Sequence, residues 1–344
     1  MKRVIVAPLN WGLGHATRCI PIINALINAQ FTPIIASDGK ALQFLEKEFP
    51  SLETLELPSY QISYGKNLKL DLLRKFPRFL NVMKEEHRAI QEYIQSNEVV
   101  GIISDNRFGV YAESVPSVYI SHQLNVKSGI FTPITNYFHQ RIISKFNECW
   151  IPDEEGSQYS GALSQTNKKL NQKCIGVLSR FQKMEAEKSI DLLIVLSGPE
   201  PNRSLLETKL IQKFRDTDLN VYVIRGKVEA VQKVETQGKL KIINFALSGE
   251  LNGYLNVAKK VICRSGYSSI MDLIALDKEA ILIPTGGQSE QEYLANYLAA
   301  KGRFEIVKEK EVDKFEFKIN STSTLQKFQK KEWDASLFRL FHGE

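Results

Sequence analysis

Cysteine is scarce in this chain of 344 residues, and its cysteines are not clustered. The four of them, at positions 19, 149, 174 and 263, form no Cys-x-x-Cys pair and lie mostly in apolar surroundings. Structural zinc sites and disulfide frameworks depend on close, repeated cysteine spacing. We therefore expect neither a bound metal nor disulfide bonds.

Long hydrophobic runs are also missing. No run approaches the roughly 18 apolar residues of a membrane span, and Met1 to Ala7 enters a strand pattern directly, without the features of a signal peptide. The net charge of +6 is mild for this length, so nucleic acid is not required as a partner, whereas an anionic membrane surface is permitted. We expect a cytoplasmic protein that can sit at the inner face of the cell membrane.

The residues that are present describe a globular α/β protein. Hydrophobic residues make up 43% of the chain and charged residues 24%, which is ordinary composition, and the length predicts about two domains. Short apolar runs alternate with helical patterns, as expected for doubly wound parallel sheets of the Rossmann type. The clearest strand patterns are Lys2 to Pro8, Thr32 to Ser37, Val99 to Ser104, Asp191 to Leu196 and Val261 to Cys263.

The segment after Val261 to Cys263 predicts an anion site. Arg264-Ser265-Gly266 and Ser268 stand where this strand gives way to a helix. Free backbone N–H groups and the positive end of the helix dipole meet there, and the missing Cβ of Gly266 lets a phosphate come close. Asp272 lies about two turns into the helix, where its carboxylate can face a ribose diol. This layout fits a nucleotide.

A second strand, turn and helix unit follows. Ala280 to Pro284 reads as a strand, Thr285 to Ser289 as a Gly-rich turn, and the next helix opens with Glu290-Gln291-Glu292. Paired side chains that accept and donate hydrogen bonds suit the hydroxyl groups of a sugar. The alternative is an ordinary βα unit in which Ser289 is the N-cap and the acidic residues only complement the helix dipole.

Three residues near the N-terminus are candidates for proton transfer. His15 stands at the start of a helix in Gly12-Leu13-Gly14-His15, where the helix dipole should lower its pKa and keep the imidazole neutral. Asp105 and His122 follow strand patterns, and the ends of parallel strands point to one ligand crevice. One of the three is expected to be the catalytic base. The alternatives are a turn cap for His15 and an N-cap or Asx-turn for Asp105.

Residues 261–307 resemble the donor-binding half of the family 28 (MurG-like) glycosyltransferases of the GT-B superfamily. The similarity rests on Cys263-Arg264-Ser265-Gly266, the carboxylate eight positions after the arginine, Pro284, and Gln291 with its acidic neighbours, and Gly14-His15 is similar to the family's Gly-Gly-His loop. The resemblance implies two Rossmann-like domains facing a central cleft, with acceptor domain 1–178, donor domain 179–322, and a C-terminal helix, 323–344, that packs back on the first domain.

The resemblance also implies a reaction. It is the metal-independent transfer, with inversion, of a hexose or N-acetylhexosamine from a UDP-sugar to a hydroxyl of a saccharide or lipid-linked acceptor, with no cofactor. Asp272 replaces a family glutamate and Glu292 a family glutamine, so the donor sugar stays open. The residues implied in donor binding are Gly14, Gly198, Arg203, Phe245, Arg264, Ser265, Gly266, Ser268, Asp272, Glu290 and Gln291.

Residues 66–88 interleave basic residues with leucine, phenylalanine and methionine. Such a stretch suits an anionic membrane surface; the alternative is a core-packed helix with solvated lysines, interrupted at Pro77. Two other functions stay open at this point: a UDP-sugar hydrolase or epimerase on the same fold, and a non-catalytic nucleotide-sugar-binding protein.

Overall fold

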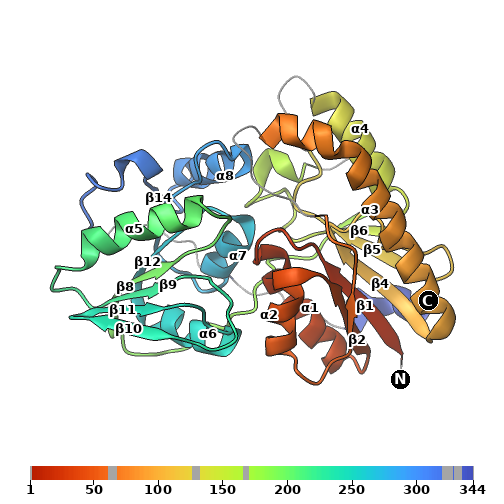
Figure 1. Ribbon diagram of the computed structural model, residues 1–344, viewed down its shortest axis with the longest axis horizontal. Coiled ribbons are helices and arrows are strands. Elements are labelled where there is room, and N and C mark those ends of the chain that lie inside the picture. Colours follow the sequence, from red (N-terminus) through yellow and green to blue (C-terminus); the bar gives the residue numbers. More distant parts are fainter. Residues whose placement is uncertain are drawn as a thin grey trace. The chain divides into compact units, whose positions relative to one another are not determined.

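The computed structural model describes residues 2–60, 68–125, 132–165, 170–319, 328 and 335–343, and the statements below refer to these residues (Figure 1). The chain forms two compact units. Unit 1 comprises residues 1–178 and 331–344, and unit 2 comprises residues 179–330. Each unit contains one seven-stranded sheet with helices connecting its strands, which confirms the predicted α/β class.

The sheet of unit 1 is parallel throughout, in the order β3-β2-β1-β4-β5-β6-β7. Its central strands are almost wholly buried, as in sheets covered by helices on both faces. The strand order reverses between β1 and β4. These two strands pair along their length, from Arg3 opposite Val99 to Pro8 opposite Asp105. The strands are β1 (Arg3–Pro8), β2 (Thr32–Ser37), β3 (Thr54–Glu56), β4 (Val99–Asp105), β5 (Ser117–Ile120), β6 (Glu148–Ile151) and β7 (Gln172–Cys174).

One helix of unit 1 differs from an alternative that the sequence left open. The long helix α3 runs through Pro77 instead of being interrupted there. Beyond the proline, Phe79, Val82 and Met83 pack with Leu9 and Tyr60, and this packing outweighs the hydrogen bond that proline cannot donate. The helical elements are α1 (Gly14–Asn28), α2 (Gly39–Glu48), α3 (Leu68–Ser96), α4 (Thr132–Ile143), η2 (Gly161–Leu163) and η4 (Ala335–His342).

A buried ion network ties α2 and α3 to the end of β4. Arg107 is fully buried and donates through Nε to Glu86 Oε1 at 2.6 Å, through Nη1 to Asp38 Oδ1 at 2.7 Å, and through Nη2 to the Pro58 carbonyl at 2.6 Å. Burial raises the pKa of Glu86, while Arg107 opposes that rise. The network fixes the loop that begins with Asp105, and thus one wall of the candidate site described below.

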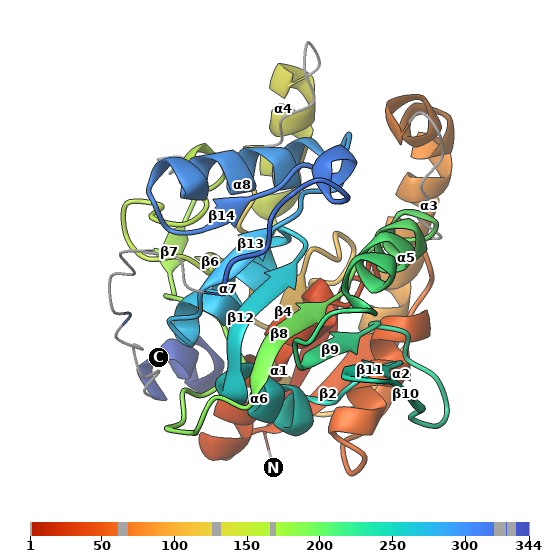
Figure 2. The ribbon, with the colours of Figure 1, turned by 90° about the vertical axis from the view of Figure 1, so that its left-hand side faces the viewer.

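The sheet of unit 2 has the order β10-β11-β9-β8-β12-β13-β14 and is parallel except at β10. Its order reverses between β8 and β12 (Figure 2). The elements are β8 (Ile190–Val195), α5 (Asn202–Phe214), β9 (Val221–Ile224), β10 (Val234–Gln237), β11 (Leu240–Ile243), α6 (Ser248–Val257), β12 (Ala258–Cys263), α7 (Tyr267–Ala275), β13 (Ala280–Leu282), α8 (Ser289–Ala300), β14 (Glu305–Ile306) and η3 (Glu309–Glu311).

The end of the chain covers the middle of the unit 1 sheet. A Cβ built on Gly101 of β4 would lie 2.2 Å from the Phe341 ring of η4, and the Phe338 ring lies 6.1 Å from that of Trp150. Leu337 and Phe341 are buried, but the described part of the predicted C-terminal helix is a 3-10 helix. Residues 320–327 and 329–334 lie outside the described residues.

The fit between Gly101 and Phe341 gives a first prediction. Gly101→Ala should lower the free energy of unfolding by about 1 to 3 kcal/mol, because the added methyl group overpacks the ring. In a Phe341→Ala background, itself destabilised by about 3 to 5 kcal/mol, the same change should have little effect. Urea unfolding followed by tryptophan fluorescence measures this cycle.

A matched control is Gly253→Ala, since Gly253 lies inside α6 and an added Cβ meets no atom within 4 Å. This change should stabilise by up to about 1 kcal/mol. Equal destabilisation by Gly101→Ala in both backgrounds would contradict the proposed contact.

Candidate active site

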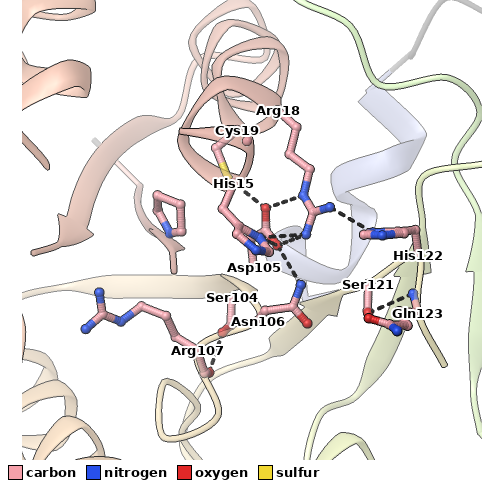
Figure 3. Close-up of polar contacts among 12 residues, drawn as sticks. His15, Arg18, Cys19, Ser104, Asp105, Asn106, Arg107, Ser121, His122 and Gln123 are labelled. Atoms are coloured by element: carbon pink, nitrogen blue, oxygen red, sulfur yellow. Dashed lines mark hydrogen bonds and ion pairs between the residues drawn. The ribbon is translucent and has the colours of Figure 1, made fainter. Parts of the chain in front are cut away.

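The predicted catalytic residues of unit 1 lie where its strand order reverses. His15 is the second residue of α1, Asp105 the last residue of β4, and His122 follows β5 by two residues. The carboxyl ends of parallel strands meet at one edge of the sheet, and a reversal of strand order opens a crevice between the loops there. The structure brings these three residues into one cluster (Figure 3).

Arg18, which the sequence did not single out, connects the cluster. Its guanidinium donates from Nε to Asp105 Oδ2 at 2.5 Å and from Nη2 to Asp105 Oδ1, and its Nη1 lies 3.0 Å from His122 Nδ1 (Figure 3). His15 Nδ1 lies 3.0 Å from Asp105 Oδ1. Arg18 and His15 are three residues apart and so lie on one face of the helix. This spacing is the feature of the sequence that could have predicted their contact.

The environment sets the charge of Asp105 and His15. Burial alone would raise the pKa of Asp105, but Arg18 and then His15 outweigh burial, so this pKa is lowered and the carboxylate stays ionised. Burial lowers the pKa of His15, Asp105 raises it, and Arg18 lowers it again, with a net lowering. The predicted direction for His15 is confirmed, and burial is the largest cause. Asp105 is an ion-pair partner, not the predicted alternative of a helix cap.

The hydrogen bonds of His15 allow two tautomers. Its Nδ1 lies 3.0 Å from Asp105 Oδ1 and 2.8 Å from Arg18 Nη2. A carboxylate only accepts and a guanidinium only donates, so Nδ1 carries a proton when it bonds to Asp105 and lacks one when it bonds to Arg18. In the first state Nε2 is unprotonated and can accept a proton.

The predicted nucleotide site of unit 2 also lies at a reversal of strand order, between β8 and β12. Gly266 is the N-cap of α7, and a Cβ built on it would meet no atom within 4 Å. Gly198, after β8, has a positive φ of 103° and similar open space. The two glycines therefore leave room for a group at the start of α7.

Asp272 on α7 interacts with Ser179 and Arg180, which were not among the predicted site residues. Ser179 Oγ donates to Asp272 Oδ1 at 2.6 Å. Burial raises the pKa of Asp272 to about 6, although Arg180 and Ser179 oppose this rise. Arg180 in turn donates to Ser248 Oγ at 3.2 Å. Ser179 and Arg180 thus join the predicted site.

Two arginines predicted to contact a diphosphate have other roles. Arg264 is 1% exposed and donates to the carbonyl groups of Ile283, Pro284 and Asn202 and to Glu309 Oε2 at 2.8 Å. Arg203 is 3% exposed and pairs with Glu200 and Glu207. A buried cation requires such partners, and these bonds hold the surrounding loops together.

The side chains of Ser265 and Gln291 are also engaged within unit 2. Ser265 Oγ donates to the Gln291 carbonyl at 2.9 Å. Gln291 Oε1 accepts from the Thr285 amide at 3.0 Å, and its Nε2 donates to Gln288 Oε1 at 2.6 Å. These bonds shape the turn before α8, whose N-cap is Gln288 and not the predicted Ser289.

The remaining predicted donor-binding residues are placed as follows. Phe245 is buried, and its carbonyl accepts from Gln232 Nε2 at 2.9 Å. Ser268 lies in the first turn of α7, Glu290 in the first turn of α8, and Gly14 at the first position of α1.

Within the described ranges no three His, Cys, Asp or Glu side chains are grouped to hold a metal. The Asp-x-Asp sequence at Asp216 and Asp218 is highly exposed. None of the helices described here has the length and apolar character needed to cross a membrane.

Comparison with known proteins supplies the family. The model of the glycosyltransferase family 28 C-terminal domain matches residues 164–336. The chain belongs to glycosyltransferase family 28. It is therefore an enzyme that transfers sugar residues, which removes the alternative of a non-catalytic binding protein.

Curated relatives of this family 28 chain include two named UDP-N-acetylglucosamine--N-acetylmuramyl-(pentapeptide) pyrophosphoryl-undecaprenol N-acetylglucosamine transferase. The protein of Alkaliphilus oremlandii is 21% identical over 57% of this chain and 58% of its own length. The protein of Caldanaerobacter subterraneus subsp. tengcongensis is 22% identical over 83% of each chain. An uncharacterized glycosyltransferase of Methanosarcina acetivorans is 23% identical over 85% of this chain and 82% of its own.

Solved glycosyltransferases share the fold. SnogD from Streptomyces nogalater superposes with a TM-score of 0.64 at 12% identity, covering 92% of this chain and 89% of its own. Acinetobacter baumannii MurG gives a TM-score of 0.53 at 10% identity, covering 91% and 89%. The family 28 chain therefore has the GT-B type of fold predicted from its sequence.

The pKa of Asp272 predicts a pH-dependent stability. An acid whose pKa is about 6 when folded and near 3.9 when unfolded binds more protons in the folded state, so its charge destabilises the protein above pH 6. Asp272→Asn should raise the free energy of unfolding by about 1 to 3 kcal/mol at pH 8, and the gain should vanish below about pH 4. Urea unfolding at several pH values, followed by circular dichroism, tests this.

The exposed Asp216 provides the control, because Asp216→Asn should change stability by less than about 0.5 kcal/mol. A stability gain from Asp272→Asn that did not depend on pH would refute the assignment of a raised pKa.

Proposed function

We propose that this enzyme transfers a hexose or N-acetylhexosamine, with inversion, from a UDP-sugar to a hydroxyl group of a saccharide or lipid-linked acceptor. The observation that carries the proposal is the open N-terminus of α7 at Gly266 with Asp272 on the same helix, in a chain of family 28. UDP-N-acetylglucosamine in the names of several relatives supports a uridine nucleotide donor.

Unit 2 binds the donor in this proposal. The diphosphate lies at the start of α7, where free N–H groups and the helix dipole favour negative charge, and the glycines at 198 and 266 leave space for it. Asp272 accepts hydrogen bonds from the ribose hydroxyls, which replace the solvation that burial removes from its carboxylate. A thymidine diphosphate complex of the structural neighbour SpnG is consistent with a nucleoside diphosphate at such a fold.

His15 is the catalytic base. Asp105 is ionised and enclosed by donors, and His122 Nδ1 is bound to Arg18, so His15 Nε2 is the best placed acceptor of the three. It takes the proton of the acceptor hydroxyl as that oxygen attacks C1 of the sugar. The bond from C1 to the diphosphate breaks and UDP leaves with the electron pair, stabilised at the start of α7. Arg18 and His122 position the Asp105–His15 pair.

The transfer needs no metal ion. Residues 66–88 contact an anionic membrane at the inner face of the cell membrane. Backbone donors at helix ends take the charge that a metal would otherwise balance, so EDTA should leave activity unchanged. For the membrane contact, Leu80 is exposed, whereas Phe79, Val82 and Met83 pack within unit 1. Residues 66 and 67 and the side chains of 68–76 lie outside the described residues.

Donor binding can be measured directly. UDP and UDP-N-acetylglucosamine should bind to the purified protein in titration calorimetry, whereas GDP and NADH should not. Asp272→Ala should weaken the binding of UDP roughly 10-fold to 100-fold, because hydrogen bonds to a charged group contribute about 1.5 to 3 kcal/mol. The Asp216→Asn variant should bind like the wild type. An unchanged affinity in Asp272→Ala would remove Asp272 from the site.

The role of His15 predicts a kinetic change. His15→Asn should lower kcat about 100-fold to 10,000-fold, the usual contribution of a general base, while the Kd for UDP stays the same. His342, at the surface, gives the matched variant His342→Gln, which should keep full activity. A His15→Asn enzyme with normal kcat would show that the base lies elsewhere.

A further inference from the structure

A chain of polar side chains, half-buried at Asn106 and buried at Tyr119 and His139, leads away from Asp105. Asn106 Nδ2 donates to Asp105 Oδ1 at 3.2 Å (Figure 3). Tyr119 Oη, from β5, donates to Asn106 Oδ1 at 2.7 Å. His139 Nε2, from α4, lies 3.3 Å from Tyr119 Oη. These contacts connect β4, β5 and α4 in a line that ends at the carboxylate of Asp105.

The direction of every hydrogen bond in this chain is fixed by Asp105. An ionised carboxylate can only accept, so the amide nitrogen of Asn106 must face it and the amide oxygen must face Tyr119. The Tyr119 hydroxyl therefore donates to Asn106 and accepts from His139. His139 must then carry its proton on Nε2. The chain is a relay in which each donor points toward Asp105.

The protonation states of His139 and Tyr119 agree with that direction. Burial lowers the pKa of His139 to about 4, although a hydrogen bond with the Leu124 backbone opposes this fall, so the ring is neutral near pH 7 and carries one N–H. Its Nδ1 is buried and has no hydrogen-bond partner among the described residues, as expected for the unprotonated nitrogen. Burial also raises the pKa of Tyr119 well above its usual value, so the phenol keeps its proton.

The relay costs conformational and desolvation free energy. Its presence therefore indicates a role at the cluster of His15 and Asp105. Asn106 holds φ at 59°, a left-handed conformation that costs a non-glycine residue about 1 kcal/mol or more. Tyr119 and His139 lie within 6.0 Å of the Phe108 ring, and Tyr119 packs on Phe146 at 5.0 Å. Apolar side chains could fill this aromatic cluster without polar atoms that need partners.

We propose that Asn106, Tyr119 and His139 are positioning residues that orient Asp105 and set the tautomer and basicity of His15. This inference rests on the proposed function in that His15 is taken as the base. The relay offers hydrogen-bond donors to Asp105 and holds its carboxylate against rotation, so that Nδ1–H of His15 is bound and Nε2 is available to an acceptor hydroxyl.

The relay should lower the pKa of His15. The groups that face His15 are Asp105, Arg18 and His122, and the Cys19 thiol also faces Asp105. The relay directs the positive ends of its dipoles at Asp105 and so reduces the negative potential that Asp105 exerts on His15. Cutting the relay should therefore raise the pKa of His15, by about half a unit for one hydrogen bond.

The test is nitrogen-15 NMR of the histidine side chains in the full-length protein without substrate, with the His15 signals assigned from a His15→Gln sample. Two variants cut the relay at different points. Asn106→Gly removes the amide and permits the positive φ, and Tyr119→Phe removes only the hydroxyl. Both should raise the pKa of His15 by about half a unit, because Asp105 then exerts a stronger negative potential on the imidazole.

Tyr111→Phe is the matched control. Tyr111 packs on Phe146 at 5.6 Å and accepts from Lys145 Nζ at 3.0 Å, outside the relay, so its variant should leave the titration of His15 unchanged. At the far end, His139→Leu should act like Tyr119→Phe, whereas His139→Gln, which keeps an N–H donor, should restore most of the wild-type pKa.

These measurements separate the relay from the proposed function. If both relay variants titrate at His15 like the wild type, the relay is overturned, even if their stability falls. If the His15 pKa shifts but the protein neither binds UDP nor transfers sugar, the relay stands and the proposed function falls. Should one variant fail to fold, the other gives the same reading.

Discussion

The ion pair between Arg18 and Asp105 is the interaction on which the candidate site of unit 1 depends. A carboxylate at the buried end of a central strand would normally take up a proton, yet Asp105 stays charged because a guanidinium on the adjacent helix donates to both of its oxygens. The same guanidinium reaches His122. The residue that holds the charge in place also determines where both imidazoles lie.

The two aspartates of the proposed mechanism show how environment separates identical side chains. The pKa of Asp105 is lowered by a direct cation, whereas burial raises the pKa of Asp272, because Arg180 and the hydroxyl of Ser179 do not outweigh the loss of water around its carboxylate. Asp105 is thereby fully satisfied within the protein and suited to positioning. The carboxylate of Asp272 can accept further hydrogen bonds, which the two hydroxyl groups of a diol can donate. Each unit places its aspartate beside a reversal of strand order, where the loops diverge.

Local patterns in the sequence predicted much of this structure. Thr32–Ser37 is a strand with the predicted bounds, and Gly266 and His15 stand at helix starts as expected. Strands β7 and β10 were missed because Gln172–Cys174 and Val234–Gln237 carry no apolar run. Arg18 and the true roles of Arg203 and Arg264 were beyond local reasoning, since their charges are decided by carboxylates and carbonyl groups that folding brings close, such as Glu309 for Arg264.

The contact between Gly101 and Phe341 has a consequence for the order of events during synthesis. The strand that carries Asp105 is made early, but the ring that covers its middle belongs to the last residues of unit 1, which follow all of unit 2 in the chain. On the ribosome, the face of β4 at Gly101 stays uncovered until Phe341 is made, 240 residues later (341 − 101). During that interval, the uncovered apolar face of β4 would be a binding site for a chaperone.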